Sequence, residues 1–275
     1  MIIEDLNNFY EKKGISALHF NCHHYNSCFN STSHKEDFST TREPYVGRNY
    51  GKPNLPKLLF LSLDPGYSRE ESGKTIIKTR IETENWPEEN SRGGNVKGRH
   101  WYRTHQFTWE VFNQFNILTN SNLNIGEVNS KKEFINNENI HKIQPFFAHT
   151  NSAKCCMNNE KNSQASNTLF KNCRDFIIEE ISIFNPNILV TQGNKAREVI
   201  EEGIKKSKIK LIESKNISNA GKKDDFSIIE MNNQKLVWIH HYHPNNYGQF
   251  KKIKNNYENF AKEAIQYLID NDMFN

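Results

Sequence analysis

The chain has 275 residues, enough for one sizeable α/β core and too few for two ordinary domains joined by a linker. Its 36 Lys and Arg against 32 Asp and Glu give a formal net charge of +4, which permits a polyanionic partner but lacks the strongly basic footprint of a dedicated nucleic-acid binder. No stretch approaches the roughly 20 apolar residues that span a bilayer, and the first residues lack the basic flank and apolar run of a signal peptide, so we expect none. We expect a single cytoplasmic domain over residues 1–275, without a membrane partner.

Short apolar runs bounded by turn residues predict four buried strands. These runs cover residues 57–63, 145–150, 187–191 and 235–240. Helical periodicity predicts helices over residues 104–118, 167–184, 194–206 and 250–269. Strands that alternate with helices favour a three-layer α/β/α fold with a mainly parallel central sheet. Residues 208–231 predict an antiparallel extension of this sheet.

Polar residues follow each predicted strand at its carboxyl end. Asp64 follows the first strand, Asn151 the second, Gly193 the third and His243 the fourth. Ligands of open α/β sheets bind beyond the carboxyl ends of the parallel strands. The sequence therefore predicts that an acid, an amide and an imidazole meet at one edge of the sheet.

Cysteine usage favours metal ligation over disulfides. Five cysteines form an odd count in a chain that we expect to be cytoplasmic. Cys22 and Cys28 lie in a polar N-terminal stretch, and 17 residues separate Cys155 from Cys173. These two pairs could supply four thiolates to one iron–sulfur cluster or zinc ion, and their spacing does not choose between the two. We expect the segment at about residues 15–56 to clasp this centre.

Other interpretations of the cysteines stay open. Cys173 lies on the apolar stripe of a predicted helix, where a buried cysteine is often a small hydrophobic side chain. Cys156 could replace Cys155 as a ligand, and His23 and His24 beside Cys22 would allow a mixed zinc site.

The stretch FFAHTNSAKC, residues 146–155, with the next cysteine at Cys173, resembles the middle of the iron–sulfur-containing uracil-DNA glycosylases. These enzymes are the fourth family of the uracil-DNA glycosylase superfamily. The resemblance implies that Asn151 reads a flipped base and that a 4Fe–4S cluster, with zinc as the lesser possibility, is bound by cysteines. It assigns ligand roles to Cys155 and Cys173, and Cys22 and Cys28 complete the expected set.

The superfamily's two catalytic motifs also have counterparts in the chain. Residues 62–66, SLDPG, resemble the first motif, and residues 243–247, HPNNY, resemble the second. The fourth family usually has Glu where this chain has Leu63, and Asp64 instead occupies the place of the water-activating Asp of the best-known uracil glycosylases. Those enzymes place a Tyr that blocks pyrimidine C5 where this chain has Gly66, although the fourth family also has Gly there. The N-terminal cysteine pair is wider than the usual C-x-x-C.

Excision of a pyrimidine develops positive charge on the sugar and negative charge on the base. A carboxylate at Asp64 suits the sugar and its attacking water, and a hydrogen-bond donor at His243 suits the base. The amide of Asn151 can read the edge of a pyrimidine. Asp-Pro-Gly is also common turn chemistry, and His240 and His241 compete with His243 for the imidazole role.

A flipped base needs stacking partners, and its DNA needs phosphate contacts. Trp101 and Tyr102 are candidates for stacking, with core packing as the alternative. The basic residues of the stretch before the first predicted helix, together with an aromatic residue of the second motif, are candidates for DNA binding. They are Lys97, Arg99, Arg103 and, as a wedge, Tyr247.

The sequence thus favours a monomeric, monofunctional DNA glycosylase that takes uracil or a C5-modified pyrimidine, which in phage DNA would imply a defence role. A catalytically inactive, metal-stabilised nucleic-acid-binding module is the second hypothesis. A zinc hydrolase that uses His240, His241 and His243 is the third.

Overall fold

The computed structural model describes residues 2–32, 38–64, 73–85, 99–126, 137–157, 165–243 and 247–274. Of residues 99, 137–139, 156–157 and 247 it describes the backbone alone.

A seven-stranded sheet with the order β2-β4-β3-β6-β9-β8-β7 forms the centre of the fold. Its four central strands, in the order β4-β3-β6-β9, are parallel, and β2, β8 and β7 are antiparallel at the two edges. The strands are β2 (Tyr45–Val46), β3 (Leu58–Ser62), β4 (Phe147–Asn151), β6 (Ile188–Gln192), β7 (Lys210–Lys215), β8 (Phe226–Met231) and β9 (Gln234–His241). A separate antiparallel pair joins β1 (Phe38–Thr41) to β5 (Cys155–Met157).

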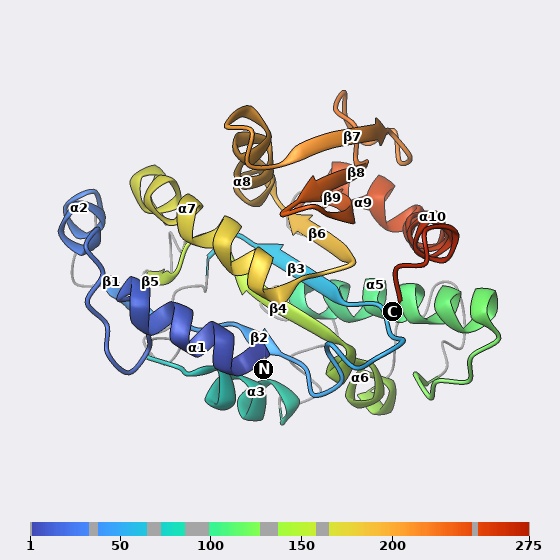
Figure 1. Cartoon of the computed structure of the whole chain (residues 1–275), viewed down its shortest axis with the longest axis horizontal. Coiled ribbons are helices and arrows are strands. Elements are labelled where there is room, and N and C mark those ends of the chain that lie inside the picture. The colour runs from blue at the N-terminus through green and yellow to red at the C-terminus, as the bar shows by residue number, and fades with distance from the viewer. Residues whose placement is uncertain are drawn as a thin grey trace.

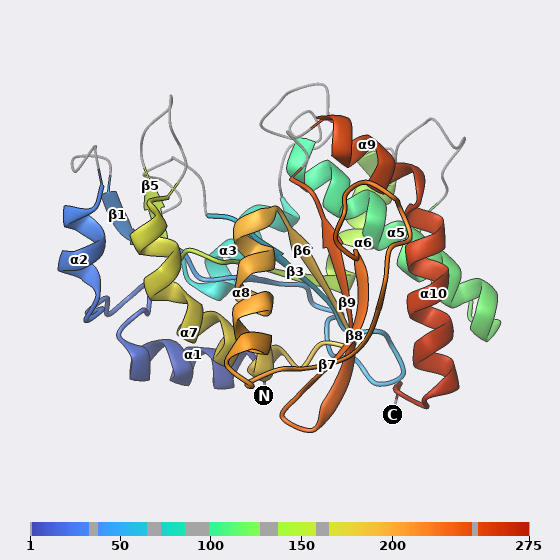
Figure 2. The same cartoon turned by 90° about the horizontal axis from the view of Figure 1, so that it is seen from above.

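Helices cover both faces of the sheet (Figures 1 and 2). One face is covered by α1 (Ile2–Lys13), α7 (Asn167–Phe184) and α8 (Asn194–Lys205), and the other by α5 (Arg99–Thr119) and α10 (Tyr257–Asp270). The remaining elements are α2 (Tyr25–Asn30), α3 (Ile76–Glu84), α6 (Asn137–Ile143), the 3₁₀ turn η3 (Gln144–Phe146) and α9 (Tyr247–Asn255). The predicted three-layer α/β/α fold with its antiparallel extension is confirmed.

The central strands are apolar on both faces, which explains their continuous hydrophobic runs. In β3, Leu59 and Leu61 belong to the core under α1, α7 and α8, whereas Leu58 and Phe60 belong to the core under α5 and α10. Each of these four side chains is fully buried.

Several element boundaries differ from those expected. The predicted helix over residues 104–118 begins at Arg99, and the predicted last helix is two helices, α9 and α10, separated at Asn256. The predicted strand over residues 145–150 begins only at Phe147, because Pro145 lacks the N–H that a strand ladder needs and lies in the η3 turn. Residues 21–56 and 68–100, whose polar and poorly periodic sequence predicts long loops, contain α2, β1, β2 and α3.

A buried ion pair links the first face of the sheet to its helices. Lys154 Nζ lies 2.6 Å from Glu180 Oε1, and the two side chains are 3% and 0% exposed. Thr150 donates a hydrogen bond of 2.9 Å to the same carboxylate, and Tyr10 of α1 also donates to it. Burial and the Glu180 charge raise the pKa of Tyr10, so its hydroxyl stays protonated as a donor. The network joins α1, β4 and α7.

Removing the Glu180 carboxylate should destabilise the fold strongly. We expect Glu180→Ala to lower the free energy of unfolding by about 3–5 kcal/mol, because it leaves the buried Lys154 ammonium unpaired. Glu179→Ala is the matched control, since Glu179 pairs with Lys13 in partly exposed positions of 47% and 29% and should change stability by less than about 1 kcal/mol. Urea unfolding of both variants measures these changes. Equal losses of unfolding free energy would contradict the stabilising role of the buried Lys154–Glu180 pair.

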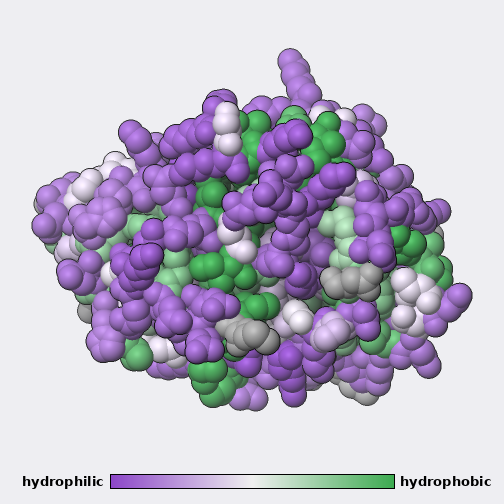
Figure 3. Space-filling model, viewed as in Figure 1, coloured by the Kyte–Doolittle hydropathy of each residue, from purple (hydrophilic) through white to green (hydrophobic). Residues whose placement is uncertain are grey.

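The face in Figure 3 is mainly hydrophilic, with apolar side chains in small groups. Among helices of the described ranges, none has the length and apolar character to cross a membrane.

Candidate active site

The carboxyl ends of the parallel strands bring the first motif beside Asn151. In the parallel pairing of β3 with β4, Ser62 is the register partner of Asn151. Beyond the strands, the backbone N–H of Ser152 donates to Ser62 O at 2.9 Å, and that of Ala153 donates to Leu63 O at 2.9 Å. The two chains therefore leave the sheet together, and Asp64 comes next.

Gly193 joins the other two strand ends to this edge. Its N–H donates to His241 O at 2.8 Å, and its φ of +101° lies in the region that favours glycine. A Cβ at this position would lie 2.9 Å from Leu63 Cδ2 and 3.5 Å from His243 Cβ. The absence of a side chain at Gly193 thus lets residues near Asp64 approach His243.

The Ser62 hydroxyl is the hub of a buried polar network. It donates to Gln192 Oε1 at 2.7 Å and lies 2.7 Å from His149 Nε2 and 3.0 Å from His100 Nε2. Gln192 Nε2 in turn donates to Thr104 Oγ1 at 3.1 Å, and Thr104 donates to the His100 carbonyl at 3.1 Å. Because the single hydroxyl proton goes to Gln192, both imidazoles donate from Nε2 in this assignment.

Three imidazoles at this edge are neutral at neutral pH. The rings of His100 and His243 stack with centroids 5.7 Å apart, and those of His100 and His149 lie 5.5 Å apart. Burial, with a contribution from His243, lowers the pKa of His100 to about 3, and burial also lowers the pKa of His149 and His243. His243 is therefore available as a neutral hydrogen-bond donor.

Asp64 and Asn151 occupy different environments. Asp64 Oδ2 accepts a hydrogen bond of 2.8 Å from the backbone N–H of Ala165, just before Ser166, which caps the N-terminus of α7. This bond orients the carboxylate. Asn151 is 7% exposed, and in the described part of the chain its side-chain amide makes no hydrogen bond. Its donor and acceptor thus remain available to a ligand.

Of the two stacking candidates, Trp101 reaches this edge. Its partly buried ring lies 4.8 Å from the His149 ring, and Tyr45 and Phe147 pack beside it. Tyr102 is only 1% exposed, so in this arrangement its ring offers no open face to a base. The Arg103 guanidinium lies 5.2 Å from the centroid of that ring and also contacts the Phe250 ring. A contact of Arg103 with a DNA phosphate would therefore have to coexist with this packing.

Several predicted site residues fall outside the described residues. They are Gly66 and Lys97, together with the side chains of Arg99 and Tyr247. Residues 244–246 of the second motif are also outside.

The predicted cysteine ligands gather on the first face of the sheet. Cys28, Cys155 and Cys173 are buried, Cys22 is partly buried, and none of the four forms a disulfide with another described residue. Burial raises the pKa of Cys22 and Cys28 and raises that of Cys173 to about 12, to which the nearby thiols of Cys28 and Cys22 also contribute. Asn172 Nδ2 donates to Cys28 Sγ at 3.2 Å, and backbone N–H groups donate to Cys22 and Cys173.

No three His, Cys, Asp or Glu side chains in the described ranges lie close enough together to hold a metal ion. Four thiolates around a cluster stand farther apart, because the cluster itself fills the space between them, and hydrogen bonds to the sulfurs are a feature of such sites. The rings of His23 and His24 lie 3.8 Å apart by their centroids at a tilted angle, and both contact the Phe176 ring.

The third hypothesis, a zinc site formed by His240, His241 and His243, is wrong, because the side chains of His240 and His241 face opposite sides of the sheet. His240 faces α8, where its Nδ1 lies 3.1 Å from Thr191 Oγ1. His241 faces the opposite side, where its ring stacks on Tyr257 and lies 4.6 Å from Phe107. Strand alternation places the two side chains on opposite faces of the sheet.

His241 is a buried histidine without hydrogen bonds to other described residues. Neither ring nitrogen has a partner, and burial lowers the pKa of His241 to about 3. The unfolded chain binds a proton here below a pH of about 6.5, whereas the folded chain does not until about pH 3. The contribution of His241 to stability is therefore complete above about pH 6.5 and is lost as the pH falls below it.

Replacing His241 should reduce acid sensitivity. The substitution His241→Phe keeps a ring in the same aromatic surroundings. When the pH falls from 7.5 to 5, we expect this variant to lose about 2 kcal/mol less stability than the unsubstituted chain. The measurement is urea unfolding at several pH values for both proteins. If stability changed with pH equally in both proteins, the role of His241 in acid sensitivity would be contradicted.

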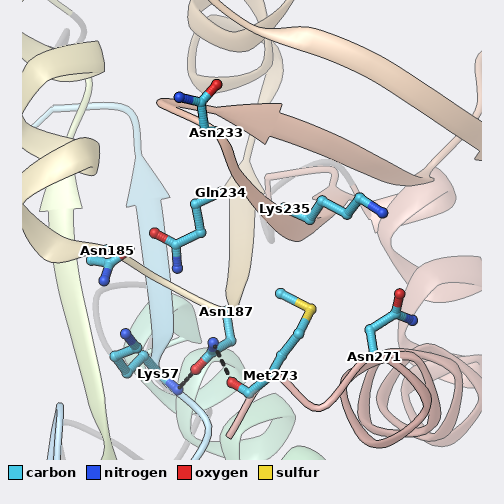
Figure 4. Close-up of a pocket in the computed structure, with 8 residues that line it drawn as sticks. All are labelled: Lys57, Asn185, Asn187, Asn233, Gln234, Lys235, Asn271 and Met273. Atoms are coloured by element: carbon cyan, nitrogen blue, oxygen red, sulfur yellow. Dashed lines mark hydrogen bonds between the residues drawn. The ribbon is translucent and has the colours of Figure 1, made fainter. Parts of the chain in front are cut away.

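Two pockets lie away from this edge. A pocket of about 420 Å³ lies at the amino ends of the central strands, where Asn187 accepts from the Lys57 N–H and donates to Met273 O (Figure 4). Its Asn185 and Asn233 have positive φ, as turn residues do. A second pocket of about 360 Å³ beside α8 is lined by Arg197, Glu201 and Lys223, and Glu201 forms ion pairs with both cations. Neither pocket contains the clustered imidazoles.

A family model described as the uracil DNA glycosylase superfamily matches residues 48–269. The match covers about four fifths of the chain, and the chain therefore belongs to this superfamily. It includes Asp64, Asn151 and His243 and leaves Cys22 and Cys28 outside. No curated protein matches the chain in the second comparison.

Sequence analysis missed the hub at this edge. Ser62 and His149 are polar side chains inside otherwise apolar strands, a signal that could have marked them. His100 carries no comparable signal, because it precedes the predicted helix over residues 104–118.

Proposed function

We propose that the chain is a monofunctional DNA glycosylase that extrudes a pyrimidine nucleotide from DNA and hydrolyses its N-glycosidic bond, leaving an abasic site. Membership of the superfamily supports this function. The observation that carries it is the gathering at one sheet edge of the strand ends that bear Asp64, Asn151 and His243.

In this proposal Asp64 acts on the sugar side. Its carboxylate orients the attacking water and stabilises the positive charge that develops on the sugar ring. The hydrogen bond from the Ala165 N–H positions the carboxylate near the N-terminus of α7, where the helix dipole favours a negative charge.

His243 acts on the base side. The departing pyrimidine carries negative charge, and a neutral imidazole N–H donates to it without a prior protonation. Burial lowers the pKa of His243 and favours this neutral form. Lys154, three residues after Asn151 in the chain, is bound by Glu180, which agrees with hydrolysis without a Schiff base.

Asn151 reads the base, and Trp101 stacks against it. The open amide of Asn151 would pair with the amide edge of a pyrimidine. Uracil is one substrate, and Gly66 in place of a blocking side chain leaves a C5-modified pyrimidine, including a hypermodified phage base and a defence role, as the other. Lys97, Arg99 and Arg103 would contact phosphates, with Tyr247 as the wedge.

Loss of the acid or the imidazole should abolish base release. We expect Asp64→Asn and His243→Ala each to lower the single-turnover rate by about 10²–10⁴-fold, because each removes a group that acts in the transition state. Matched controls are Asp175→Asn and His19→Ala, whose side chains are 68% and 74% exposed and which should leave the rate unchanged. The measurement is release of free base from duplex oligonucleotides that contain uracil, hydroxymethylcytosine or its glucosylated form.

The outcomes separate the competing functions. Base release that survives both substitutions would contradict the assigned roles. Binding of these DNAs without release of any base would favour the second hypothesis, an inactive nucleic-acid-binding module.

We also propose that Cys22, Cys28, Cys155 and Cys173 hold a 4Fe–4S cluster, as in the fourth family. The buried thiols and the N–H donors around them support this assignment. A bound cluster would cross-link α2, β5 and α7 and so hold the segment at about residues 15–56 against the domain.

Iron content tests the cluster. We expect the purified protein to contain about four iron atoms per chain and to absorb near about 400 nm, and we expect Cys173→Ser to lose both properties because it removes one thiolate. Cys155→Ser compared with Cys156→Ser identifies the ligand of that pair. Zinc in place of iron would overturn the cluster assignment.

A further inference from the structure

His100 is an unassigned imidazole beside His243. It lies in the first turn of α5, and its ring stacks on that of His243 with centroids 5.7 Å apart and planes inclined by 30°. Nothing in the sequence motifs refers to this residue, which follows an undescribed stretch of chain.

The hub fixes the orientation of the His100 ring. Nε2 of His100 lies 3.0 Å from Ser62 Oγ, whose own proton goes to Gln192. Thr104 and Gln192 close a loop of hydrogen bonds back to the His100 carbonyl. Rotation of the ring would break its bond to Ser62, so both the backbone and the side chain of His100 are held.

His243, by contrast, lies past the end of the strand pairing of β9. The pairing of β9 with β6 ends at His241, two residues before His243. On one side Gly193 allows close approach to the His243 Cβ, and on the other the His100 ring packs against the imidazole. The stacked ring thus restricts the position of the His243 side chain.

We propose that His100 is a positioning residue for His243: anchored by Ser62, its ring holds the His243 imidazole toward the departing base. The inference rests on the proposed glycosylase function. A chain of contacts then runs from Gln192 through Ser62 and His100 to His243 and connects the ends of β6, β3 and β9 through α5.

A double-mutant cycle tests the proposal. In single-turnover base release we expect His100→Ala to lower the rate by roughly 10- to 100-fold with little change in DNA affinity, because misplacement of a catalytic group affects chemistry more than binding. In the His243→Ala background the same substitution should have no further effect. Ser62→Ala should resemble His100→Ala, and Ser62→Thr, which keeps the hydroxyl, should restore most of the rate.

An equal loss from His100→Ala with and without His243 would show a merely structural role and overturn the proposal. A readout without turnover keeps the test independent of the proposed function. In NMR spectra of the histidine side chains, His100→Ala should shift the resonances and the titration of His243, with His19→Ala as the exposed control. Unchanged His243 resonances would overturn the positioning role even if no base were released by the unsubstituted protein.

Discussion

Four parallel strands end at the same edge of the sheet, and the register of their pairing decides which side chains can meet there. Ser62 and Asn151 are partners in the pairing of β3 with β4, and Gln192 and His241 are partners in that of β6 with β9. The backbone bonds beyond the strands extend this alignment by a few residues. The candidate active site depends on that alignment, because its acid, amide and imidazole come from segments far apart in the chain.

The same edge carries an unusual amount of buried polarity. At the carboxyl ends of the parallel strands, the buried Ser62 hydroxyl has three hydrogen-bond partners. Three neutral imidazoles lie close to one another at the same edge. Neutral rings can be buried together because no charge is removed from water, whereas protonation of one would be opposed by burial and by its neighbours. On the opposite face, Lys154 and Glu180 neutralise each other between the helices and the cysteine-bearing segments. The neutral network around Ser62 and the Lys154–Glu180 ion pair therefore lie on opposite faces of the sheet.

The sequence predicted the four central strands and the helices α7 and α8 well, because their apolar runs reflect burial on both faces or one helical stripe. It also placed Asp64, Asn151 and His243 after strand ends, which is a consequence of chain direction alone. The early start of α5 was not predictable from periodicity, since the positions three and four residues after Trp101 hold the polar residues Thr104 and His105. The role of Ser62 as a hub could not be predicted either, because it depends on contacts with residues 38 to 130 positions away. The different surroundings of Trp101 and Tyr102 follow from about 100° of rotation between helix neighbours, which only the helix register reveals.

The central claim is that three separate strand ends form one binding place for an extruded base. The most direct test is a crystal structure of the protein with duplex DNA that carries a pyrimidine nucleotide resistant to hydrolysis. The account predicts that the base lies within hydrogen-bond distance of the Asn151 amide and the His243 imidazole, with the sugar beside Asp64. A base bound elsewhere on the protein, or one that remains stacked in the duplex over an unoccupied sheet edge, would contradict it.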